Sequence, residues 1–147
     1  MSPSDLRSPY VKLAGICYLA RMLDKIRVRA AGLLPAEYHA NLGGGFDERA
    51  LSFLWIEYPP LVERVKNGGT DEEIAEWTFS QGRHPSPEDI EIWNEFMRKR
   101  GWDDEASPRL AQRKAESGFQ NRDDIQTFFA YIDADEGRDP KVTSRAG

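Results

Sequence analysis

Residues 13–32, LAGICYLARMLDKIRVRAAG, carry the pattern from which the fold of this chain follows. With about 100° of rotation per residue, as in an α-helix, apolar side chains gather on one face. Asp24 and Arg27 fall inside that face, four residues after Ala20 and Leu23. The apolar residues of the face are Leu13, Ile16, Ala20, Leu23, Ile26 and Ala30. The segment therefore predicts a long core helix with two charged residues on its buried side.

The expected helix begins near Ser8 and Pro9, a capping residue followed by proline in the first turn. It ends at Gly32, because glycine readily takes the left-handed conformation that closes a helix. Residues 33–46, LLPAEYHANLGGGF, contain a proline and three consecutive glycines. These residues interrupt regular structure, so a long irregular loop is expected after the first helix.

Capping residues and apolar spacing predict further, mostly short helices. Thr70 and Glu73 form a capping box, and Ser86-Pro87 begins the next helix. The expected helices lie at residues 47–56 with Asp47 as the cap, at 61–67, from Thr70 to Gly82, from Ser86 to Gly101, from Ser107 to Gly118, and around 125–132. No segment alternates as a strand does. We therefore expect an all-α fold: a compact single-domain bundle of six or seven helices over residues 1–137, with a disordered tail at 138–147.

Composition narrows the class of protein. The chain has 147 residues, a net charge of -5 and a single cysteine, Cys17. A net negative charge argues against a general nucleic-acid binder, and one thiol forms neither an intramolecular disulfide nor a Cys-based zinc site. The N-terminus has no apolar signal segment and no run reaches the ~18 apolar residues of a membrane span. A soluble, cytoplasmic protein is expected, with its oligomeric state open.

Several blocks of sequence resemble a known family. They are SDLRSPYVKLAGICYLARMLDKIRVRAAGLLP, YHANLG, GGTDEEIAEW, EIWNEFMRKRGW, RDDIQTFF and IDADEGR, in this order, from about residue 5 to residue 138. Together they are similar to a bacterial family catalogued as domain of unknown function 5069. The resemblance implies a small bacterial protein and brings no established activity, cofactor or catalytic residue.

The charged residues of the first helix are one candidate site. Asp24 and Arg27 could orient a ligand in a dry pocket, with Arg21 and Lys25 as an anion-binding edge. The alternative is a structural ion pair, or charges that reach solvent along their flexible stems. In either case each buried charge needs a partner, because an unpaired buried charge is strongly unfavourable.

Two other segments are candidates. Tyr38 and His39, in the loop segment 38–41, could supply acid–base chemistry, or the loop could simply hydrogen-bond its own backbone. The acidic residues 133–136 end a helix where the dipole is already negative, which indicates a cation site or, in preference, a salt bridge to Arg21 or to an arginine of residues 98–100.

The sequence contains no motif for binding a transition metal or a cofactor. The two histidines, His39 and His84, are far apart, and no phosphate-binding loop follows the glycines at 43–45. We therefore expect no cofactor and no metal site. The leading hypothesis is a binding or protein-interaction module without catalysis of its own. The alternative is a small enzyme or metabolite-binding protein with an anion-accepting pocket between the first helix and residues 38–41.

Overall fold

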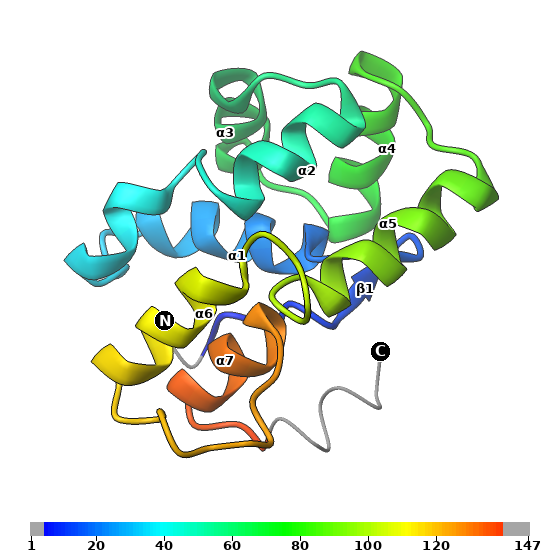
Figure 1. Ribbon diagram of the computed structural model, residues 1–147. Helices are drawn as coiled ribbons and strands as arrows, with labels where there is room; N and C mark the ends of the chain where they lie inside the picture. The colour runs from blue at the N-terminus through cyan, green and yellow to red at the C-terminus, as the bar shows by residue number, and fades with distance from the viewer. Residues whose placement is uncertain (1–4, 140–147) are drawn as a thin grey trace.

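A computed structural model gives the fold and describes residues 5–139. The chain is mostly helical, as predicted, and carries one small antiparallel hairpin (Figure 1). In chain order the elements are β1 (Lys12–Leu13), β2 (Ile16–Cys17), α1 (Leu19–Ala30), the 3-10 helix η2 (Ala36–Asn41), α2 (Phe46–Leu54), α3 (Tyr58–Lys66), α4 (Asp71–Gln81), α5 (Pro87–Lys99), α6 (Ser107–Glu116) and α7 (Phe128–Asp135). Within the described residues, every helix is too short or too polar to cross a membrane.

The first helix begins later than the sequence predicts. It starts at Leu19 instead of Pro9, because the chain first forms the β1–β2 hairpin. Ala14 and Gly15 have φ of 54° and 80° in the hairpin turn, and Tyr18 has φ of 73° directly before the helix. These left-handed residues cannot continue a right-handed helix. The expectation of no strands was also wrong, because strands of two residues are too short to show an alternating pattern in the sequence.

Helix α1 is the centre of the core. It lies across the middle of the molecule, between α2–α4 on one side and α6–α7 on the other (Figure 1). Ala30, the last member of the predicted apolar stripe, is exposed. Leu23 and Ile26 of that stripe are almost completely buried, and so is Met22, which the stripe did not include. They pack in one cluster with side chains from five other helices: Leu54, Leu61, Ile74, Met97 and Phe129.

The segment after α1 also differs from its prediction. Residues 36–41 form the 3-10 helix η2, so the irregular loop is shorter than expected. Helix α2 begins at Phe46 with Gly45 as its N-cap, and Asp47 is not the cap. The Asp47 carboxylate is instead completely buried against Lys25 and Tyr18, which are sequence-distant partners. A local capping rule could not reveal them.

The capping box predicted at Thr70 is present, and the structure shows a second one at Ser86. The Thr70 hydroxyl accepts from the Glu73 backbone N–H at 3.1 Å, and Ser86 accepts from the Asp89 N–H at 3.1 Å. In each box the acidic side chain accepts a hydrogen bond from the backbone N–H of the capping residue. These contacts fix where α4 and α5 begin.

The C-terminal part of the fold is held by charged residues. Arg138, which the predicted tail included, forms ion pairs with Asp133 at 3.1 Å and with Glu136 at 2.8 Å. It also donates to the Leu6 carbonyl oxygen. The part of the predicted tail from residue 140 onward lies outside the described residues.

Gly82, at the end of α4, is a position where we expect any side chain to be damaging. A Cβ there would collide with the Leu54 carbonyl oxygen and lie 2.7 Å from the Trp55 carbonyl oxygen. Both neighbours are backbone atoms, so Gly82→Ala should lower the free energy of unfolding by about 1–3 kcal/mol through overpacking. Urea denaturation measures this loss. Gly44→Ala is the matched control, because its nearest neighbour lies 3.9 Å away; equal midpoints for the two variants would contradict the prediction.

Candidate functional site

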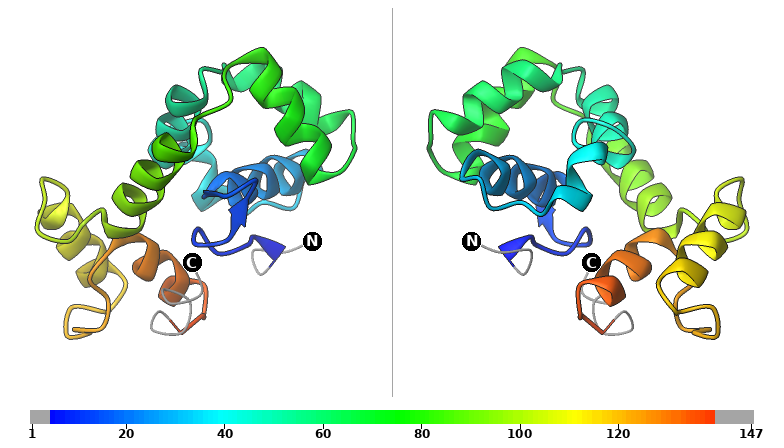
Figure 2. Two further views of the ribbon diagram at one scale, coloured as in Figure 1. Left: turned by 90° about the vertical axis from the view of Figure 1, so that its right-hand side faces the viewer. Right: turned by 90° about the vertical axis from the view of Figure 1, so that its left-hand side faces the viewer.

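An open cleft of about 630 Å³ separates the α6–α7 pair from α1, η2 and the start of α2. In the side views of Figure 2, α6 and α7 lie together at one end of the molecule, away from α3 and α4. The cleft is thus formed by segments from both halves of the chain. It has a basic side, a buried polar floor and a patch of half-buried aromatic rings.

Four arginines line the basic side of the cleft: Arg49, Arg100, Arg109 and Arg113. The guanidinium carbons of Arg49 and Arg100 lie 5.0 and 5.5 Å from the centre of the Phe96 ring. Arg109 and Arg113 are one turn apart on α6, so their side chains share a face. Arg100 pairs with Asp104 at 3.4 Å, whereas the other three form no ion pair within residues 5–139.

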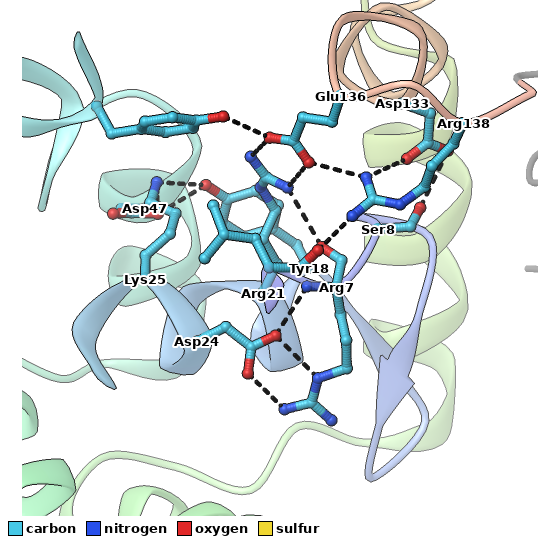
Figure 3. Close-up of polar contacts among 12 residues, drawn as sticks. Arg7, Ser8, Tyr18, Arg21, Asp24, Lys25, Asp47, Asp133, Glu136 and Arg138 are labelled. Atoms are coloured by element: carbon cyan, nitrogen blue, oxygen red, sulfur yellow. Dashed lines mark hydrogen bonds and ion pairs between the residues drawn. The ribbon is translucent and has the colours of Figure 1, made fainter. Parts of the chain in front are cut away.

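Three buried polar residues contact one another at the floor of the cleft (Figure 3). Two of them, Tyr18 and Lys25, line the cleft, whereas Asp47 does not. The Lys25 ammonium donates to Asp47 Oδ1 at 2.9 Å and to the Tyr18 hydroxyl at 3.1 Å. The Tyr18 hydroxyl donates to the same Asp47 oxygen at 2.6 Å. Burial lowers the pKa of Lys25, and the nearby charge of Asp47 offsets this only in part. Burial also raises the pKa of Tyr18. This group joins α1 to α2.

Glu136 forms a second buried contact between distant segments (Figure 3). Its two oxygens accept from Arg21 at 2.9 and 2.6 Å, and from Tyr38 and Arg138 at 3.0 and 2.8 Å. Burial alone would raise the pKa of Glu136, but the charge of Arg21 and the hydrogen bonds from Arg21, Arg138 and Tyr38 together outweigh it and lower the pKa. The expected salt bridge between the acidic segment and Arg21 is confirmed.

Asp24 and Arg27 lie in a different network, away from the cleft lining. Asp24 accepts from the Arg7 backbone N–H and from its guanidinium, each at 2.9 Å. Arg27 pairs with Asp71 at 2.7 Å and with Asp24 at 3.6 Å. The hydrogen bond to Asp24 raises the pKa of Arg7. These ion pairs hold the N-terminal segment and α4 against α1. They favour the alternative in which Asp24 and Arg27 have a structural role.

Two of the five candidate residues lie in the cleft lining. Arg21 and Tyr38 line the cleft and meet at Glu136, whereas Asp24, Arg27 and His39 do not line it. The His39 ring lies 2.8 Å from the Leu34 carbonyl oxygen, so it bonds to the backbone of its own segment.

The cysteine thiol and the side chains that could bind a metal ion are further candidate groups. Cys17 is buried, and burial raises the pKa of its thiol to about 12, which disfavours the reactive thiolate. Within the described residues there is no cluster of three metal-ligating side chains.

Two further carboxylates line the cleft near the C-terminal end of α7. Burial and the charges of Glu136 and Glu37 raise the pKa of Asp135. Glu37 and Asp135 oppose a bound anion in their vicinity, because like charges repel. An anionic group is therefore directed to the arginine side of the cleft.

Sequence reasoning missed most of the cleft. Arg109 and Arg113 belong to the helix expected from Ser107 to Gly118, but neither they nor Arg49 were singled out as site residues. The i, i+4 spacing of the two arginines on α6 was the available signal. This spacing alone could not indicate a site, because that face of α6 borders the cleft only through the way α6 packs beside α7.

Comparison with known proteins gives a family. A family model described as "Domain of unknown function (DUF5069)" matches residues 3–138, which is nearly the whole chain. No curated protein matches the chain.

Proposed function

The chain belongs to the DUF5069 family, and from that premise we propose that it is a binding module that holds a small anionic ligand in the α1–α6–α7 cleft. The module has no catalysis of its own. The proposed site shares Arg21 and Tyr38 with the anion-accepting pocket expected between the first helix and residues 38–41, and differs from it by adding the arginines of α2 and α6.

The observation that carries the proposal is the set of arginines without ion pairs. Arg49 reaches the cleft from α2, and Arg109 and Arg113 reach it from α6 on another wall. Three guanidinium groups around one cavity repel each other, and an anion removes that repulsion. Guanidinium also matches carboxylate and phosphate oxygens in paired hydrogen bonds. The cleft volume lies within the range of about 300–1,000 Å³ that small-molecule sites occupy.

The titratable groups of the floor support binding without catalysis. Tyr18, Lys25 and Asp47 are buried and bonded to one another. Glu136 is likewise saturated by two arginines and a tyrosine. Groups fixed in such contacts suit a rigid wall, since a proton carrier must exchange partners during a reaction.

Removing two arginines tests the function. We expect Arg109→Ala/Arg113→Ala to weaken the binding of inorganic phosphate at least about tenfold, because each charge-assisted hydrogen bond contributes about 1.5–3 kcal/mol. Isothermal titration calorimetry on the full chain measures the affinity. Asp135→Asn should bind phosphate more tightly, since it removes a repelling charge from the cleft.

Lys12→Ala/Arg29→Ala is the matched control. Lys12 and Arg29 are exposed and do not line the cleft, so this variant also loses two positive charges, but elsewhere on the protein. An equal loss of affinity in Lys12→Ala/Arg29→Ala would mean that net charge alone attracts phosphate. That result, or no heat of binding for the wild-type protein, would refute the proposed function.

A further inference from the structure

We propose that the ligand is an aromatic anion, in which a flat ring lies against Phe46 and Phe128 and an attached phosphate or carboxylate group meets the arginines. This inference rests on the proposed function and deepens it, because it names the chemical class that the anionic ligand belongs to.

The ring site is a corner formed by two phenylalanines. Phe46 opens α2 and Phe128 opens α7, and both line the cleft and are half-buried. Their ring planes meet at 85° with centroids 6.0 Å apart. Phe129, directly behind them, is completely buried and belongs to the core. Of these three rings, Phe46 and Phe128 therefore offer apolar surface to a molecule in the cleft.

Perpendicular rings suit an aromatic guest. Aromatic pairs prefer either an offset stack or an edge-to-face contact, with centroids about 4.5–7 Å apart. A third ring in this corner can stack on one phenylalanine while its edge meets the face of the other. Ile132, one turn after Phe128 on the same helix, also lines the cleft and adds apolar surface beside the corner. A bare inorganic anion would leave all of this apolar surface in water.

The arginines lie close enough to the corner for one small molecule to reach both. Arg49 is three residues after Phe46 on α2, so the two side chains share a helix face. On the other side, the Phe128 backbone N–H donates to the Arg100 carbonyl oxygen at 2.9 Å, so the backbones of these two residues are adjacent. The corner and the arginines line the same cavity. A ring with its anionic group attached directly, or through a short linker, fits this arrangement.

The experiment compares three probes by titration calorimetry on the full chain: phenyl phosphate, inorganic phosphate and phenol. We expect phenyl phosphate to bind at least about 30-fold more tightly than inorganic phosphate, because it adds burial of one aromatic ring to the same charge contacts. Phenol should bind more weakly than phenyl phosphate, since it lacks the anionic group.

Substitutions separate the ring contact from the charge contact. Phe128→Leu and Phe46→Leu should each reduce the advantage of phenyl phosphate over inorganic phosphate, while the affinity for inorganic phosphate stays within about twofold. Phe119→Leu is the control, because Phe119 is half-buried and does not line the cleft. Leucine keeps the sites apolar, so the variants are expected to fold, and circular dichroism checks this.

The outcomes distinguish the two proposals. Equal affinities for phenyl phosphate and inorganic phosphate would overturn the aromatic ligand and leave anion binding standing. No binding of either probe would overturn both proposals. A ring advantage that survives both Phe46→Leu and Phe128→Leu would overturn the assignment of the ring to this corner.

Discussion

An Asp47→Ala variant should lose about 3–5 kcal/mol of unfolding free energy at neutral pH, because it leaves a buried ammonium without its counter-charge. Lys25 is 5% exposed and Asp47 is completely buried. After the substitution, the Tyr18 hydroxyl is the remaining partner of the Lys25 Nζ seen in the structure. The Gly43 backbone N–H also loses its acceptor, Asp47 Oδ2. Urea denaturation followed by circular dichroism measures the loss.

The loss should depend on pH in a defined direction. Burial already lowers the pKa of Lys25, and Asp47 opposes that shift; without Asp47 the pKa falls further. Between this lowered pKa and the value of about 10.4 in the unfolded chain, the unfolded state binds more protons. The stability of the variant then rises with pH across that interval. We therefore expect the difference from wild type to shrink as the solution becomes alkaline.

Two controls make the test specific. Glu63→Ala removes an exposed ion pair with Lys66 at 3.8 Å and should cost at most about 1 kcal/mol. Lys25→Met/Asp47→Leu replaces both charges with apolar groups and should recover much of the lost stability. A loss of less than about 1 kcal/mol in Asp47→Ala would show that the pair does not hold α1 to α2.

A Glu136→Gln variant should also lose about 3–5 kcal/mol at neutral pH, because the buried Arg21 guanidinium keeps its charge and loses its counter-ion. The Arg21 and Glu136 side chains are each 5% exposed. Glutamine can still accept the Tyr38 hydroxyl but cannot pair with two arginines. The contact between α7 and α1 depends on this pair, so the variant also tests what closes one side of the cleft.

Acid titration gives an independent measurement for Glu136. Its pKa is lowered in the folded state, since the charge of Arg21 and the hydrogen bonds from Arg21, Arg138 and Tyr38 together outweigh the effect of burial, whereas the unfolded value is about 4.3. A carboxylate with a depressed folded pKa stabilises the protein fully above the unfolded pKa. That stability is lost as pH falls through the folded pKa. The wild type should therefore lose more stability than Glu136→Gln on acidification below about pH 4.3.

Glu95→Gln is the control for acid titration and for stability. Glu95 pairs with Arg98 and Lys99 at the surface, with about half of its side chain exposed. Its removal should change stability by no more than about 1 kcal/mol. Equal acid sensitivity in wild type and Glu136→Gln would show that the Arg21–Glu136 pair contributes nothing to folding.

Features that depend on neighbouring residues could be predicted from the sequence. Most of the apolar stripe of α1, the capping box at Thr70 and the helix start at Ser86 were predicted and are present. In a capping box every contact spans three residues, so its energy depends little on the rest of the fold. A salt bridge from the acidic segment 133–136 to Arg21 or to an arginine of residues 98–100 was also expected, because these carboxylates end a helix where the dipole is already negative; the structure pairs Glu136 with Arg21.

Features that depend on distant residues were decided by the tertiary structure. Tyr18 is held in a left-handed conformation, in contact with Asp47, where the apolar pattern indicated continuous helix. Glu136 is 115 residues from Arg21, and Lys25 is 22 residues from Asp47. The cleft combines arginines of α2 and α6 with rings that open α2 and α7. The sequence by itself determined the helices and their buried faces, because local hydrogen bonds and side-chain spacing favour them. Only the packing of those helices decided which charges are paired and which face a cavity, because both depend on distances between segments far apart in the chain.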